Sequence, residues 1–207
     1  MMKKYLNSCW LLLLILGFTG CRSGSVEIFN GESLDGWECD PPELMKDWHV
    51  EEGMIVGENS DSLASIIWTT AHYKDFEIEL DYMTPSKDYD SGIFTRGISH
   101  QVQIGISRSL QRDLTGCIYA PIDEQGSYPA QTDKIKEYHH EGEWNHLKVI
   151  VQGKRIQTFL NGEPFVDYQA VHIPEEGPVG LQLHGGVHMI MKFKNIKFRG
   201  LPVEQSL

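Results

Sequence analysis

His184, Arg96 and Tyr119 are the side chains whose types and surroundings are best suited to catalysis. His184 can move protons because an imidazole titrates near neutral pH, and Gly185 and Gly186 leave space beside it. The alternative for His184 is a histidine that is hydrogen-bonded within a sheet. Arg96 can polarise a carbonyl oxygen or bind hydroxyls, or it can pair with a carboxylate. Tyr119 can donate a proton or simply pack. We take these three as the candidate catalytic residues.

Three glutamines are spaced in a way that suits a polar groove. Gln101 and Gln103 are two residues apart, as are Gln182 and His184, so each pair shares one face of an extended strand. Polar side chains on a strand face are costly to bury unless they meet a ligand or one another. Amides satisfy sugar hydroxyls, and an indole stacks on a sugar ring. Gln101, Gln103, Gln182 and Trp68 are therefore the candidate sugar-binding residues.

Metal and cofactor motifs are sparse in the sequence. His139 and His140 are adjacent and point in different directions in an extended chain, and no third ligand has a convincing spacing. Neither a Gly-x-Ser-x-Gly elbow nor a phosphate-binding glycine loop is present. We expect no metal site and no cofactor, although a structural calcium ion stays open because Asp88 and Asp90 offer oxygen ligands.

The elements that must position these residues read as strands. Residues 76–82 alternate strictly between apolar and acidic side chains, and 147–151 repeat the apolar alternation, which indicates half-buried strands. Hairpins are expected at residues 50–56, 153–154 and 161–162, and a bulge between Phe193 and Ile196. No segment has a sustained helical period, so we expect an all-β sandwich. The polar stretch 121–142 is expected to be a long loop, either over a binding site or simply solvated.

The N-terminus has the order of an export signal. Lys3 and Lys4 precede the apolar run Trp10–Phe18, and Thr19-Gly20-Cys21 resembles a lipobox. We therefore expect a signal peptide over 1–20, a lipidated Cys21 with a short linker over 21–25, a domain over 26–201 and a tail over 202–207. A plain secretory signal is the alternative. The expected location is the bacterial cell envelope, with a periplasm-facing lipid anchor.

The charge balance limits the partners. The chain has 18 basic and 29 acidic residues, and loss of Lys3 and Lys4 moves the net charge from −11 to about −13. Such a surface repels nucleic acid and anionic lipid heads, so we expect the membrane to be met through the anchor only. A neutral or cationic ligand fits this charge better than a phosphorylated one, and the groove residues above point to a carbohydrate. Cys39 and Cys117 can form a disulfide in an exported protein or remain two separate buried thiols.

An ordered set of motifs resembles the family of 3-keto-disaccharide hydrolase domains and covers nearly the whole mature chain. The matching segments are Ile28–Trp37 (IFNGESLDGW), Trp48–Gly57 (WHVEEGMIVG), Trp68–Phe76 (WTTAHYKDF), Ser91–Gly97 (SGIFTRG), Thr115–Tyr119 (TGCIY), Gly142–Asn145 (GEWN), Leu160–Gly162 (LNG), Gly177–Gly185 (GPVGLQLHG) and Phe193–Ile196 (FKNI). The resemblance implies a concanavalin-like jelly roll of two antiparallel sheets with one concave face.

The resemblance also implies an exported hydrolase, or a lyase-like enzyme, that cleaves glycosidic bonds of 3-keto sugars. Removal of the acidic C2 proton needs a base, a group that polarises the ketone and an acid for the leaving oxygen, which His184, Arg96 and Tyr119 can supply. Two positions depart from the family pattern: Gln101 stands where a glutamate is common, and Ile106 replaces an aspartate. A glutamine cannot take a proton at neutral pH, so a non-catalytic carbohydrate-binding lipoprotein is the alternative.

Overall fold

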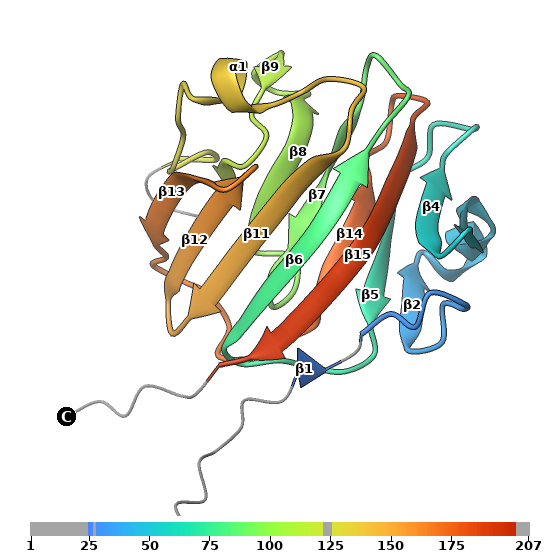
Figure 1. Cartoon of the computed structure of the whole chain (residues 1–207), viewed down its shortest axis with the longest axis horizontal. Coiled ribbons are helices and arrows are strands. Elements are labelled where there is room, and N and C mark those ends of the chain that lie inside the picture. Colours follow the sequence, from blue (N-terminus) through green and yellow to red (C-terminus); the bar gives the residue numbers. More distant parts are fainter. Residues whose placement is uncertain (1–24, 27, 122–125, 202–207) are drawn as a thin grey trace, which may run out of the picture.

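Two antiparallel sheets pack face to face in the computed structural model, which describes residues 25–26, 28–121 and 126–201 (Figure 1). This arrangement confirms the all-β jelly roll expected from the sequence. The expected signal peptide, Cys21 and the tail 202–207 lie outside the described residues.

The eight-stranded sheet forms the front layer of Figure 1. Its strands run in the order β13 (Glu163–Gln169), β12 (Arg155–Leu160), β11 (Asn145–Gln152), β6 (Phe76–Met83), β15 (Ile190–Gly200), β4 (Met54–Glu58) and β3 (Trp48–Glu51), and β1 (Ser25–Val26) pairs with β15.

The seven-stranded sheet forms the rear layer and carries most of the candidate site residues. Its strands run in the order β10 (Ile118–Tyr119), β8 (Gln101–Ser107), β7 (Asp90–Phe94), β14 (Gly180–Leu183), β5 (Ser65–Thr69) and β2 (Trp37–Asp40), and β9 (Arg112–Asp113) pairs with β8.

The core lies between the two sheets and follows from strand alternation. Every second side chain of β6 and β11 points inward and is buried, as the apolar pattern predicts. These side chains meet Ile93, Val102, Ile104 and Leu181 in one hydrophobic cluster. Because both sheets share this core, their outward faces are left to polar residues or to a ligand.

Local turns also match the sequence. Asn161 and Gly162 have φ values of 51° and 86°, as a tight hairpin between β12 and β13 requires. The register of β15 shifts between Lys194 and Lys197, which confirms the expected bulge. The structure adds two short helical turns, η1 (Pro42–Asp47) and α1 (Ile135–Tyr138). Neither of these described turns is long and apolar enough to span a membrane.

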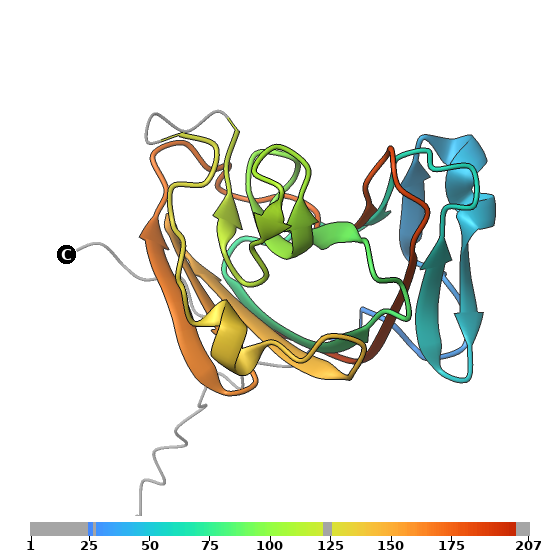
Figure 2. The same ribbon diagram turned by 90° about the horizontal axis from the view of Figure 1, so that it is seen from above.

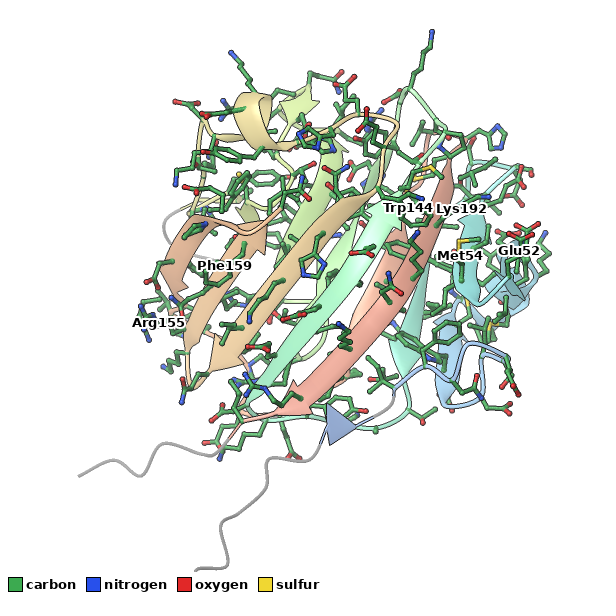
Figure 3. The ribbon with its side chains drawn as sticks, in the orientation of Figure 1. Glu52, Met54, Trp144, Arg155, Phe159 and Lys192 are labelled. Carbon is green, nitrogen blue, oxygen red and sulfur yellow. The ribbon has the colours of Figure 1, made fainter. Side chains whose placement is uncertain are left out.

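The outer face of the eight-stranded sheet is polar and internally paired. Figure 3 looks onto this face, where Arg155 and Phe159 lie on β12 and Lys192 on β15. The Lys148 ammonium lies 2.9 Å from Glu77 and 3.3 Å from Glu79, so the acids of β6 form ion pairs on the wet face that the alternation predicts.

The two cysteines of the described domain are separate. Cys39 and Cys117 are both free and buried, which settles the open choice in favour of two thiols. Burial raises the pKa of each thiol to about 11, so both are protonated and unreactive at neutral pH.

Candidate functional site

A pocket of about 340 Å³ lies on the outer face of the seven-stranded sheet. Its floor comes from β5, β7, β8, β10 and β14, and its rim from the connections that follow β7, β8, β10 and β14. Figure 2 shows the connections that follow β8 and β14, in green and in red, on opposite sides of this face. We call this pocket the groove.

Strand register arranges the outward side chains of the groove in three rows. The aromatic row is Trp68, Phe94, Gln101 and Tyr119, the amide row is Ile66, Gln182 and Gln103, and the charged row is His184 and Asp90. Neighbours in a row sit on adjacent strands, and successive rows are two residues apart along a strand. Because a strand rises about 3.3 Å per residue, the aromatic and charged rows are separated by about 13 Å.

Two glycines let large side chains lie flat on the sheet. A Cβ atom on Gly92 would stand 2.4 Å from the Gln101 amide nitrogen, and one on Gly180 would stand 2.6 Å from the Trp68 ring. Gln101 therefore crosses Gly92 to reach Gln182, and the Trp68 ring lies over Gly180, with its centroid 5.4 Å from that of Phe94.

The glutamines form the hydrogen-bonded floor of the groove. The Gln101 Nε2 atom donates to Gln182 Oε1 at 2.6 Å, which leaves the amide nitrogen of Gln182 and the carbonyl oxygen of Gln101 to meet a ligand. The Gln103 Nε2 atom donates to Asp90 Oδ1 at 2.7 Å, and Gln103 Oε1 accepts from the Tyr128 hydroxyl at 3.2 Å. The floor thus offers both a donor and an acceptor to hydroxyl groups.

An arginine and two aspartates define the charged end. Asp90 is buried, and its second carboxylate oxygen accepts from the Arg108 backbone N–H at 3.1 Å. The Arg108 guanidinium donates to both carboxylate oxygens of Asp88, at 2.5 and 3.1 Å. This hydrogen bonding raises the pKa of Arg108, so the guanidinium stays charged and lines the groove as the cation of an ion pair with Asp88 and Asp90.

His184 lies beside Asp90 in a defined tautomer. Its backbone N–H donates to the Asp90 carbonyl at 3.1 Å, which extends the β7–β14 ladder by one residue. Its Nδ1 atom lies 2.6 Å from the Gly185 carbonyl oxygen. A carbonyl can only accept, so Nδ1 carries the proton and the neutral ring keeps its lone pair on Nε2. A histidine in this state is able to act as a base.

The structure does not bring Arg96 into the groove. Its guanidinium is 2.8 Å from Asp75 and also donates to the carbonyl oxygens of Gly153 and Pro174, with only 1% of its side chain exposed. Arg96 follows Phe94 by two residues, so an unbroken strand would put both side chains on one face, but β7 ends at Phe94 and Arg96 has a φ of 56°. That left-handed residue breaks the alternation and turns the side chain away from the groove.

The other sequence candidates gather in one place. Gln101, Gln103, Gln182, His184 and Tyr119 all line the groove, and Trp68 borders it through its contact with Phe94.

Sequence reasoning missed several residues that line the groove: Asp90, Phe94, Arg108 and Tyr128. Strand alternation from Gly92 could have found Asp90 and Phe94. Tyr128 lies in the polar segment 121–142, for which a position over a binding site is one of the two expectations. Burial raises the pKa of Tyr128 to about 12. No sequence pattern placed Arg108 at the groove, because its position depends on where β8 ends.

Metal ligands do not cluster in the part of the chain that the structure describes. No group of three or more His, Cys, Asp or Glu side chains there is arranged to hold a metal ion. Asp88 and Asp90, for which calcium binding was left open, both contact Arg108 instead.

Comparison with known proteins identifies the family of this chain and several solved structures that share its fold. Residues 24–199 match the model of the 3-keto-alpha-glucoside-1,2-lyase-like domain. A search of the curated proteins found no match. A solved structure from Parabacteroides distasonis, described as that of a candidate glycosyl hydrolase, shares 22% identity with a TM-score of 0.65, over 87% of this chain and 95% of its own.

Two solved carbohydrate-binding proteins have the same fold. A carbohydrate-binding module from Bacillus subtilis has 16% identity and a TM-score of 0.51, over 80% of this chain and 96% of its own. The exoplasmic/lumenal domain of VIP36, solved with Ca²⁺ and Man3GlcNAc, has 13% identity and a TM-score of 0.60, over 89% of this chain and 91% of its own. At these identities the likeness concerns the fold alone.

Proposed function

This chain belongs to the family of 3-keto-alpha-glucoside-1,2-lyase-like domains, and on that premise we propose that its groove binds 3-keto-glucosides and cleaves their glycosidic bond by elimination. The ketone at C3 acidifies the proton on C2. A base takes this proton, and the electron pair is held as an enolate on the C3 oxygen. The C1–O bond then breaks as the C3 ketone re-forms and the C1=C2 double bond forms, and the leaving oxygen takes up the proton that the base removed.

His184 is the proposed base, and its tautomer is the observation that carries the proposal. The hydrogen bond from Nδ1 to the Gly185 carbonyl leaves a lone pair on Nε2, in a side chain that lines the groove. A neutral imidazole has the basicity that proton abstraction near neutral pH requires. Asp90, in the same row, is hydrogen-bonded to both Gln103 and Arg108, so its carboxylate is already engaged.

Arg108 takes the role that the sequence gave to Arg96. Its guanidinium is the positive charge of the described groove lining, and its Asp88 partner holds it in place. A fixed cation next to the C3 oxygen stabilises the enolate, because the charge develops in a site that is partly shielded from water. The free amide groups of Gln101 and Gln182 orient the sugar hydroxyls.

Tyr119 is proposed as a binding residue rather than as the acid. It lies on β10 in the aromatic row, whereas His184 follows β14 in the charged row. Three strand spacings of about 4.8 Å and two rows separate the backbones of these residues. The C2 proton and the leaving oxygen belong to adjacent carbons, so His184 and Tyr119 are too far apart to serve both.

Replacement of His184 tests this mechanism. His184→Gln should lower kcat on a 3-keto-glucoside by about 10²–10⁴-fold, the usual contribution of general acid–base catalysis, while substrate affinity changes far less. His188→Gln is the matched control, because His188 lies on the same connection but faces Glu58 outside the groove lining. Equal turnover by the two variants would remove His184 from the mechanism.

A non-catalytic sugar-binding role is the second candidate, and Gln101 is the observation that favours it. The family resemblance places an acid at this position, and here an amide bonded to Gln182 takes its place. The wild-type protein decides between the two functions. Binding of a 3-keto-glucoside without release of the aglycone would support the binding role, and turnover would exclude it.

We also propose export to the cell envelope through a lipid on Cys21, which rests on the N-terminal sequence. Cys21→Ala should abolish incorporation of labelled fatty acid and release the protein from the membrane fraction. Undiminished labelling of this variant would show that the lipid is attached elsewhere.

A further inference from the structure

The end of the groove away from His184 is apolar. Phe94 and Ile98 line it, and the Trp68 ring packs against Phe94. Ile98 is 71% exposed, the highest value among the exposed large hydrophobic side chains of the described residues. A single exposed isoleucine is ordinary on a protein surface, but one that lines the same pocket as Phe94 forms part of a larger apolar surface.

The two ends of the groove differ in polarity. The distance between them suits a ligand of two connected rings. Asp90, His184 and Arg108 occupy one end, and the aromatic row lies about 13 Å away along the strands. A single sugar ring placed against His184 covers the charged and amide rows. Whatever is attached to C1 of that sugar is then able to extend over the aromatic row.

We infer that this end of the groove binds an apolar, ring-shaped aglycone, so that the preferred ligands are glucosides of hydrophobic alcohols rather than disaccharides. The inference rests on the proposed function for the orientation of the sugar. Phe94 and Ile98 carry no hydrogen-bonding groups, whereas a second sugar would need partners for its hydroxyls at this end. Gln101 and Tyr119 carry the polar groups of the aromatic row, and the Gln101 nitrogen is already bonded to Gln182, which leaves few partners for the several hydroxyls of a second sugar.

A matched pair of ligands tests the aglycone. Benzyl and methyl α-glucosides share the sugar and have alkyl leaving groups of similar basicity, so they differ mainly in apolar area. The benzyl compound should bind about 10-fold more tightly in calorimetry, as burial of a phenyl ring in an apolar site implies. Their 3-keto forms should show the same ratio in KM.

Variants assign the effect to this end of the groove. Ile98→Ser should remove most of the benzyl advantage and leave the methyl compound unchanged. Leu63→Ser, which truncates another exposed large hydrophobic side chain (51%) on the β4–β5 connection, outside the groove lining, should retain the advantage. Circular dichroism verifies that both variants fold.

The outcomes separate the inference from the proposed function. Equal affinity for the two glucosides, or a benzyl advantage that survives in Ile98→Ser, would overturn the apolar aglycone site. Tighter binding of a 3-keto-disaccharide than of the 3-keto benzyl glucoside would overturn it as well. An absence of turnover on every 3-keto-glucoside would refute the proposed function, while the binding measurements would still judge the aglycone site.

Discussion

Arg96 and Arg108 show how differently two arginines of one sheet are used. Arg108 lies at the groove with 25% of its side chain exposed, held by Asp88. Arg96 is buried with Asp75 below the end of β7 and links it to the connections around Gly153 and Pro174. One guanidinium borders the groove while bonded to Asp88 and to the Ile106 carbonyl oxygen, and the other holds segments of the fold together.

Removal of Arg96 should therefore harm stability rather than chemistry. Arg96→Met leaves the Asp75 carboxylate buried without its partner, which typically costs about 3–5 kcal/mol in the free energy of unfolding. Lys74→Met, which breaks an ion pair whose side chains are 46% and 88% exposed, should cost less than about 1 kcal/mol. Denaturant unfolding measures both. Loss of activity in Arg96→Met without loss of stability would contradict this role.

At the scale of elements, the segment between β10 and β11 is fastened to the sandwich by a buried polar chain. His139, which follows α1, places its Nδ1 atom 2.6 Å from Asp113 on β9 and its Nε2 atom 3.3 Å from the Tyr89 hydroxyl. A cavity of about 670 Å³ adjoins His139 and Asp113, so this chain spans a loosely packed edge. The same segment supplies Tyr128 to the groove, which links its anchoring to the site.

This fastening should depend on pH through Asp113. Burial raises the pKa of Asp113, but hydrogen bonds with His139 and Thr115 outweigh it and hold the pKa below its ordinary value. Ionised Asp113 therefore stabilises the fold above the unfolded-state pKa of about 3.9, and this contribution is lost as the pH falls through the lower folded-state pKa.

Asp113→Asn should lower the unfolding free energy by about 1–3 kcal/mol at pH 7, and the difference from wild type should shrink toward pH 3. Asp133→Asn, which changes another carboxylate at the same cavity, serves as the control. Thermal unfolding across this pH range provides the measurement. A difference that is the same at pH 3 and pH 7 would show that the Asp113 charge is not involved.

The same scale shows what could be predicted from the sequence. Alternation in β6 and β11 and the turn residues Asn161 and Gly162 predicted strands and hairpins, because these signals are local. The spacing of two residues also predicted that Gln182 and His184 share one face of a strand. The meeting of Gln101 with Gln182 was not, because it depends on β7 lying between β8 and β14 and on the missing Cβ of Gly92.

At the scale of the whole molecule, the two outer faces of the sandwich have different roles. The eight-stranded sheet covers its outer face with ion pairs between its own strands. The seven-stranded sheet instead leaves amide groups, an imidazole nitrogen and an apolar end facing the groove. Figure 2 shows the connections that follow β8 and β14 on this side of the sandwich. A ligand therefore meets one face on which polar atoms are left to it, among them the Gln101 carbonyl oxygen, the Gln182 amide nitrogen and His184 Nε2.

The fate of the C2 hydrogen tests the proposed elimination most directly. A 3-keto-glucoside that carries deuterium at C2 is incubated with the protein in ordinary water, and both products are measured by mass spectrometry. We expect the aglycone to appear together with a sugar product that has lost its deuterium and is lighter than the free keto sugar by one water. His184→Gln should slow both changes equally. Release of the aglycone with deuterium retained at C2 would contradict the mechanism.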